Sequence, residues 1–135
     1  MKTKNLFFTI VALFVATVVA TVVVAGTLAS FKWAETDHDF GKIPQRKPVT
    51  VQFQFKNSGG EPLIVSDAKG SCGCTGVEFP KEPVLPNQSG TIKATFDAAA
   101  IGPFTKSVTV FSNAAEGVTV LRFQGEVVEL SKPTR

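Results

Sequence analysis

The chain has 135 residues, a formal net charge of +3, and a hydrophobic content of 44%. This length allows one domain, and the apolar content excludes a disordered chain. Two of the 14 basic residues, Lys2 and Lys4, precede an apolar run, and the others are scattered along the sequence. A scattered charge of this size makes nucleic acid an unsuitable partner.

The first expected element is a hydrophobic helix. Residues 6–30 contain no charged side chain and are rich in Val, Ala, Leu and Phe. As a helix, this run would extend about 37 Å, which exceeds the roughly 30 Å hydrocarbon core of a bilayer. A segment in lipid must satisfy its backbone hydrogen bonds internally, so a helix is expected despite the many valines.

Two fates are open for residues 1–30: a retained membrane anchor or a cleaved signal peptide. The length of the apolar run favours the anchor, whereas small residues at 23–25 and 27–29 offer sites for a signal peptidase. Lys2 and Lys4 predict a cytoplasmic N-terminus. The expected location is therefore the cytoplasmic membrane, single-pass with the C-terminal domain outside the cytoplasm. The alternative is a periplasmic or secreted protein.

The rest of the chain is patterned for β-strands. Residues 49–57 alternate apolar and polar side chains most clearly, and similar short runs are separated by Gly, Pro and Asn. We expect an all-β, immunoglobulin-like antiparallel β-sandwich of about seven strands over residues 31–130, followed by a short polar tail at 131–135. The expected strands cover residues 34–40, 49–57, 63–69, 76–79, 91–97, 104–112 and 118–128.

The only two cysteines, Cys72 and Cys74, flank Gly73 in an otherwise β-patterned region. Residues two apart in an extended strand lie roughly 7 Å apart at Cα, at the limit for a disulfide, and a turn at Gly73 would shorten this distance. Such a bond closes a very small loop and constrains the unfolded chain little. One hypothesis is therefore a local disulfide, or two buried thiols, that shapes the loop.

Two further hypotheses use the thiols of Cys72 and Cys74 directly. The first is a soft-metal site for copper or zinc, although a closed zinc site needs four ligands and His38 is the only histidine. The second is thiol exchange, although the Cys-x-x-Cys spacing at a helix start is missing.

No enzymatic constellation is visible in the sequence. His38 lies between Asp37 and Asp39, but on a strand both carboxylates would point away from it. No nucleophile elbow, phosphate loop or HExxH motif is present. We therefore predict a protein that is not an enzyme, with no catalytic residue and no cofactor.

Six segments of the sequence are distinctive: residues 38–43, 55–63, 71–75, 102–104, 112–113 and 125–127. Together they resemble the DUF1573 family of bacterial exported proteins. The resemblance covers residues 33–128, and the Cys-Gly-Cys-Thr motif is its most specific element. It implies an immunoglobulin-like fold in the cell envelope and no established activity.

The leading functional prediction is a non-enzymatic cell-envelope module that contacts a protein or glycan through strand edges or loops. The membrane would be its second partner, through residues 6–30. The alternative is soft-metal binding or a thiol redox function through Cys72 and Cys74.

Overall fold

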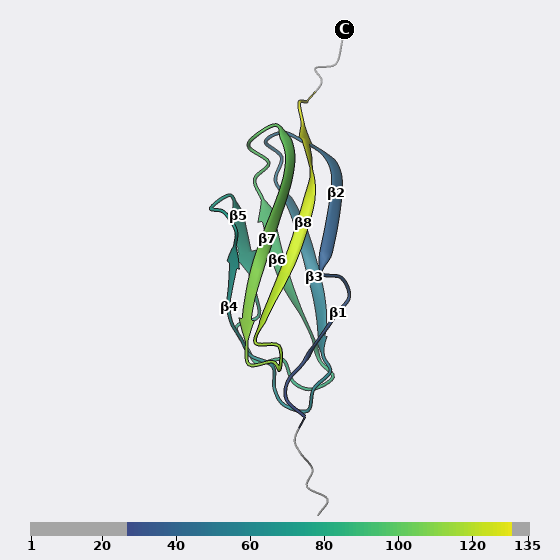
Figure 1. The fold of residues 1–135 in the computed structure, drawn as a ribbon, viewed down its shortest axis with the longest axis vertical. Coiled ribbons are helices and arrows are strands. Elements are labelled where there is room, and N and C mark those ends of the chain that lie inside the picture. Colours follow the sequence, from purple (N-terminus) through teal and green to yellow (C-terminus); the bar gives the residue numbers. More distant parts are fainter. Residues whose placement is uncertain (1–26, 131–135) are drawn as a thin grey trace, which may run out of the picture.

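The computed structural model describes residues 27–130, which form a sandwich of β-strands without a helix (Figure 1). The predicted N-terminal helix and the polar tail lie outside the described residues. Among residues 27–130, no helix has the length and hydropathy to cross a membrane. The strands are β1 (Phe31–Trp33), β2 (Asp37–Pro44), β3 (Val49–Asn57), β4 (Val65–Gly70), β5 (Thr75–Glu78), β6 (Ser89–Phe96), β7 (Gly102–Ser112) and β8 (Val118–Val128).

The strands form two four-stranded sheets. Sheet A has the order β1-β3-β6-β5, and sheet B has the order β2-β8-β7-β4. Every pair is antiparallel except β2 and β8, which run parallel. The all-β class is confirmed, but the expectation of a wholly antiparallel sandwich is wrong for this one pair.

The first part of the domain also corrects the predicted strand count. The sequence predicts one strand at residues 34–40 and about seven in all, whereas residues 27–130 form eight. β1 pairs with β3 in sheet A, and after residues 34–36 the chain continues as β2 beside β8 in sheet B. The expected strand 34–40 therefore overlaps only β2, and the short strand β1 before it was not predicted.

The core lies between the inner faces of the two sheets. In β3 every second side chain is buried, including Val51, Phe53 and Phe55, and Leu121 and Phe123 of β8 face them from sheet B. Burying one such side chain contributes about 1.5–3 kcal/mol relative to leaving it exposed. The alternation of the sequence therefore determines which face of each strand becomes core.

A buried asparagine connects several segments by hydrogen bonds at the end of the sandwich where the described chain begins. Asn57 is fully buried, and its Nδ2 donates to the carbonyls of Glu61 at 2.7 Å and Val84 at 2.9 Å. Its Oδ1 accepts the N–H groups of Gly59 at 3.0 Å and Ser30 at 3.4 Å. One side chain thus ties the residues before β1 to two loops.

On two of the edge strands, a side-chain carboxylate accepts a backbone N–H group of its own strand. In β4 the N–H of Ala68 donates to Asp67 Oδ1 at 2.8 Å, and in β2 the N–H of Gly41 donates to Asp39 Oδ1 at 2.8 Å. Both strands also carry an irregularity in their pairing. Such features oppose the addition of another strand, and the other two edge strands, β1 and β5, have only three and four residues.

Candidate functional site

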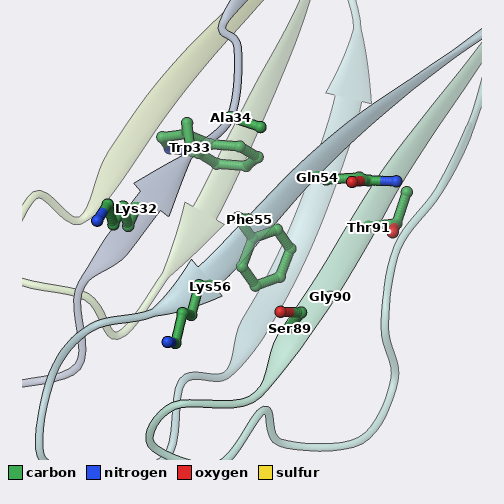
Figure 2. A pocket seen from close by; sticks show the side chains of 9 residues that line it. All are labelled: Lys32, Trp33, Ala34, Gln54, Phe55, Lys56, Ser89, Gly90 and Thr91. Atoms are coloured by element: carbon green, nitrogen blue, oxygen red, sulfur yellow. The ribbon is translucent and has the colours of Figure 1, made fainter.

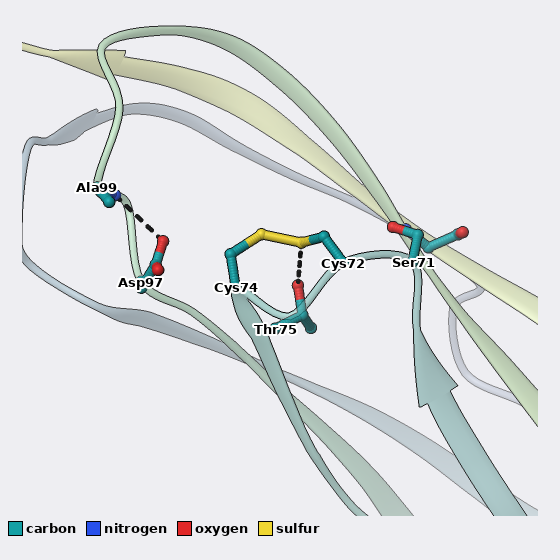
Figure 3. Close-up of a disulfide and its surroundings, with 7 residues drawn as sticks. Ser71, Cys72, Cys74, Thr75, Asp97 and Ala99 are labelled. Carbon is teal, nitrogen blue, oxygen red and sulfur yellow. Dashed lines mark hydrogen bonds between the residues drawn. A yellow bond between two sulfur atoms is a disulfide. The ribbon is translucent and has the colours of Figure 1, made fainter.

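The two cysteines lie in the turn that carries the chain from β4 in sheet B to β5 in sheet A. A disulfide joins Cys72 and Cys74, whose Cα atoms are 5.2 Å apart (Figure 3). This Cα separation is shorter than that of an extended strand, because the chain turns at Gly73. The turn also closes the open side of the sandwich between the edge strands β4 and β5.

Thr75 holds the cysteine turn from the β5 side. Its N–H donates to the carbonyl of Cys72 at 3.3 Å, and its Oγ1 lies 3.5 Å from Cys72 Sγ. Thr75 is only 9% exposed, and a Cβ placed on Gly70 would come within 3.0 Å of Thr75 Cβ. The threonine is therefore closely packed, and the position of its hydroxyl beside Cys72 is set by that packing.

The neighbouring strands fix both ends of the turn. The N–H of Ser71 donates to the carbonyl of Ser107 at 2.8 Å, and the N–H of Ser107 donates to Ser71 Oγ at 3.1 Å. On the other side, the N–H of Asp97 donates to the carbonyl of Cys74 at 3.2 Å. The backbone on each side of the disulfide is thus hydrogen-bonded to one of the two sheets.

The two cysteines have different surroundings. Cys74 packs against the hydrophobic core, whereas the sulfur of Cys72 lies beside the Thr75 hydroxyl. Gly73 between them is exposed, and a Cβ there would meet no atom within 4 Å. The outer side of the turn is therefore open to a reacting molecule.

His38 is far from the cysteines. It lies on β2 and the cysteines follow β4, and these strands are the opposite edges of sheet B with two strands between them, a separation of roughly 14 Å. His38 Nδ1 is 3.1 Å from Glu35 Oε1, so the carboxylate that contacts it belongs neither to Asp37 nor to Asp39.

No metal site is assembled around these residues. Within residues 27–130, no group of three or more His, Cys, Asp or Glu side chains is placed to hold a metal ion. In the disulfide form neither cysteine offers a thiolate ligand. The soft-metal hypothesis therefore stays a prediction for the reduced form.

A trough runs across β1, β3 and β6 of sheet A (Figure 2). Its volume is about 490 Å³, and no residue of sheet B lines it. Lys32 pairs with Lys56 in the sheet register, and the acid-base pairs within residues 27–130 are His38–Glu35 and Lys69–Asp67. The trough is therefore lined by two lysines that face one another across β1 and β3, and neither forms an ion pair with a carboxylate of residues 27–130.

Several exposed apolar side chains lie in one half of the outer face of sheet B. Phe111 pairs with Val118, and their exposed fractions are 36% and 49%; Val120, two residues further along β8, is 40% exposed. Ile64, 46% exposed, shares two hydrogen bonds with Asn113 beside them. We call Ile64, Phe111, Val118 and Val120 the apolar patch.

The other half of this face is polar and borders β2. Asp39 Oδ2 accepts a hydrogen bond from Gln124 Nε2 at 3.3 Å. The N–H of Gly41, and after it the amide of Gln124, hold the pKa of Asp39 below its ordinary value of 3.8. The two halves of one sheet face thus differ sharply in chemistry.

The sequence prediction missed the role of Thr75, the trough and the apolar patch. Thr75 is the last residue of the Cys-Gly-Cys-Thr motif, so its position was visible in the sequence, but its contact with Cys72 was not. Phe111, Val118 and Val120 read as ordinary strand residues, since alternation alone does not show which apolar positions stay exposed.

The fold has clear relatives among solved structures. A protein of unknown function from Porphyromonas gingivalis W83 superposes with a TM-score of 0.66 at 11% identity over 78% of this chain and 50% of that one. The VesB protease of Vibrio cholerae gives 0.62 at 15% identity, over 73% and 32%. The PapD-like domain 7 of human CEP192 gives 0.59 at 9% identity, over 83% and 93%.

At these identities the likeness concerns the fold alone. The chain spans half of the Porphyromonas protein and about a third of the protease. No curated protein matches the sequence.

The protein is an all-β sandwich of two sheets, similar to PapD-like domains, with a disulfide-bonded turn between its edge strands. It belongs to the family DUF1573, described as a protein of unknown function, whose model matches residues 31–127. The family assignment confirms the resemblance seen in the sequence.

Proposed function

We propose that this protein is a non-enzymatic, immunoglobulin-like module of the cell envelope that binds another protein through the apolar patch on sheet B. The patch is the single observation that carries the proposal. Neighbouring apolar side chains on a solvent-exposed face mark surfaces that bind other macromolecules. The similarity to a PapD-like domain supports the immunoglobulin-like class.

The patch is a better docking surface than the strand edges. Edge addition needs a row of free N–H and C=O groups, whereas Asp67 and Asp39 already bond N–H groups on β4 and β2. By contrast, Phe111, Val118 and Val120 lie side by side on two long central strands. We therefore place the protein contact on a sheet face and not on an edge.

The envelope location in this proposal rests on the sequence of residues 1–30. The apolar run at residues 6–30 would hold the domain at the outer side of the cytoplasmic membrane, or direct its export. A disulfide is also typical of an oxidising compartment outside the cytoplasm.

Site-specific photo-crosslinking in intact bacterial cells tests the proposal. A crosslinking residue at Val120 should give a discrete protein adduct, and the matched control at Gln124, four residues further along the same strand face, should give none. Adducts of equal intensity at both positions, or a glycan adduct at Val120, would contradict protein binding by the patch.

A further inference from the structure

The cysteine turn has chemistry that protein binding through the apolar patch does not use. Cys72 and Cys74 are half-buried, and the glycine between them projects into open space. The turn and the patch are also separated along the molecule. Gly70, just before the turn, pairs with Val108, three residues from Phe111 in the same strand, a distance of roughly 10 Å.

We propose that the turn is a thiol–disulfide exchange site in which Cys72 is the reacting cysteine, Cys74 is the resolving cysteine and Thr75 is a positioning residue. The substrate class is an accessible disulfide, or the corresponding dithiol, of a second protein. This inference goes beyond the proposed protein-binding role and does not depend on it.

The asymmetry of the turn assigns the two roles. A hydroxyl that donates a hydrogen bond stabilises a thiolate, and the Thr75 hydroxyl lies 3.5 Å from Cys72 Sγ. Apolar surroundings disfavour a thiolate, and Cys74 packs against the core. In the reduced protein Cys72 is therefore the more readily ionised and the more reactive thiol.

The elements around the turn also carry charged side chains. The neighbouring elements carry Lys69 on β4, Lys106 on β7 and Asp97 after β6. Lys69 is paired with Asp67, and Asp97 Oδ1 accepts the N–H of Ala99 at 3.1 Å. Lys106 Nζ lies 6.0 Å from the centre of the Phe96 ring.

The exchange takes two displacement steps, in which atoms and electrons balance. The Cys72 thiolate attacks one sulfur of the substrate disulfide, forms a mixed disulfide at Cys72 and releases the other substrate sulfur as a thiolate. Cys74, after losing its proton to solvent, attacks Cys72 Sγ, closes the Cys72–Cys74 disulfide and releases the second substrate thiolate. The substrate disulfide gains two electrons and the protein dithiol loses two. The reverse sequence oxidises a substrate dithiol.

The test compares single-thiol variants of the full-length chain. Cys74→Ser keeps Cys72, and Cys72→Ser keeps Cys74. Their alkylation by iodoacetamide is followed against pH by intact mass. We expect Cys72 to react roughly tenfold faster at neutral pH and with a lower pH midpoint. Equal rates and midpoints for the two variants would overturn the assignment of Cys72.

Thr75 is then changed in the Cys74→Ser chain. Thr75→Val should remove most of the rate advantage and raise the pH midpoint, whereas Thr75→Ser, which keeps the hydroxyl, should restore both. Urea unfolding of each variant separates this effect from a loss of fold. A Thr75→Val chain that is folded and reacts as fast as its parent would contradict a positioning role for the hydroxyl.

Exchange itself is tested with two probes, a disulfide-bonded Cys-x-x-Cys peptide and oxidised glutathione. The Cys74→Ser chain should trap a mixed disulfide with the peptide, and the Cys72→Ser chain should trap much less. A mixed disulfide with glutathione alone would contradict a protein substrate. The absence of any adduct at Cys72 would overturn the exchange site as a whole.

Discussion

The core between the two sheets and the cysteine turn differ in how deeply their side chains are buried. Phe53 and Phe123 are fully buried, and they lie on β3 and β8, whose pairings with β6 and β7 run in continuous register. Cys72–Cys74 closes a loop of three residues on an exposed turn. The fold draws its stability from the core, and the turn is therefore free to carry chemistry. Substitutions in the core should accordingly cost more than substitutions in the turn.

Phe53→Ala should cause the largest loss of stability. The side chain is fully buried in the central strand β3, and replacing such a phenylalanine by alanine costs about 3–5 kcal/mol. Urea unfolding followed by tryptophan fluorescence from Trp33 measures the change. A loss below about 1 kcal/mol would mean that the core is not where the stability lies.

Asn57→Ala should come next. The change leaves the carbonyl of Glu61 and the N–H of Gly59 without this partner, whereas the carbonyl of Val84 still accepts the N–H of Leu63. Both of these hydrogen bonds are partly buried, so each group left unpaired should cost about 1–2 kcal/mol, and we expect a total loss of roughly 2–4 kcal/mol. The same unfolding assay applies. Exchange of the Gly59 amide hydrogen should also become faster, and unchanged exchange would show that the hydrogen bond is unimportant.

A matched pair of glycine substitutions compares the two regions directly. A Cβ at Gly90 would lie 2.5 Å from Cζ of the Phe55 ring, which contacts Phe31 and Trp33, whereas a Cβ at Gly73 meets nothing within 4 Å. Gly90→Ala should therefore cost about 1–3 kcal/mol, and Gly73→Ala less than about 0.5 kcal/mol. A larger loss for Gly73→Ala would reverse the comparison.

Asp39→Asn should give the smallest effect, confined to acid pH. The pKa of Asp39 is lowered in the folded protein, chiefly by the Gly41 N–H, so its carboxylate stabilises the fold above the ordinary value of 3.8. This contribution is lost as pH falls from 3.8 through the lower folded value. The variant should therefore lose less stability than the wild type over this range. Parallel acid curves would contradict the link to Gly41.

Strands with strong alternation were predictable from the sequence. The predicted strands 49–57 and 118–128 coincide with β3 and β8, because a period of two fixes which residues face the core. The strands before β3 were not predictable from the sequence, because the separation of β1 from β2 depends on which sheet each of them joins. The parallel pairing of β2 with β8 follows from that same crossing.

The cysteine turn was predictable only in part. The sequence shows that Cys72 and Cys74 can reach one another if the chain turns at Gly73. It does not show the hydroxyl of Thr75 beside Cys72 or the core beside Cys74, because these contacts depend on the packing of Gly70, β5 and β6. Sequence alone therefore treats the two cysteines as equivalent, whereas the structure distinguishes them.

The most direct test of the division between core and turn is the free energy of unfolding of the full-length protein with the disulfide intact and after reduction. Closing a three-residue loop restricts the unfolded chain by about 1.6 kcal/mol at most, so the reduced protein should unfold cooperatively with a loss no greater than this. A reduced protein that is unfolded, or that loses as much stability as Phe53→Ala, would show that the disulfide is a structural staple and would contradict the account.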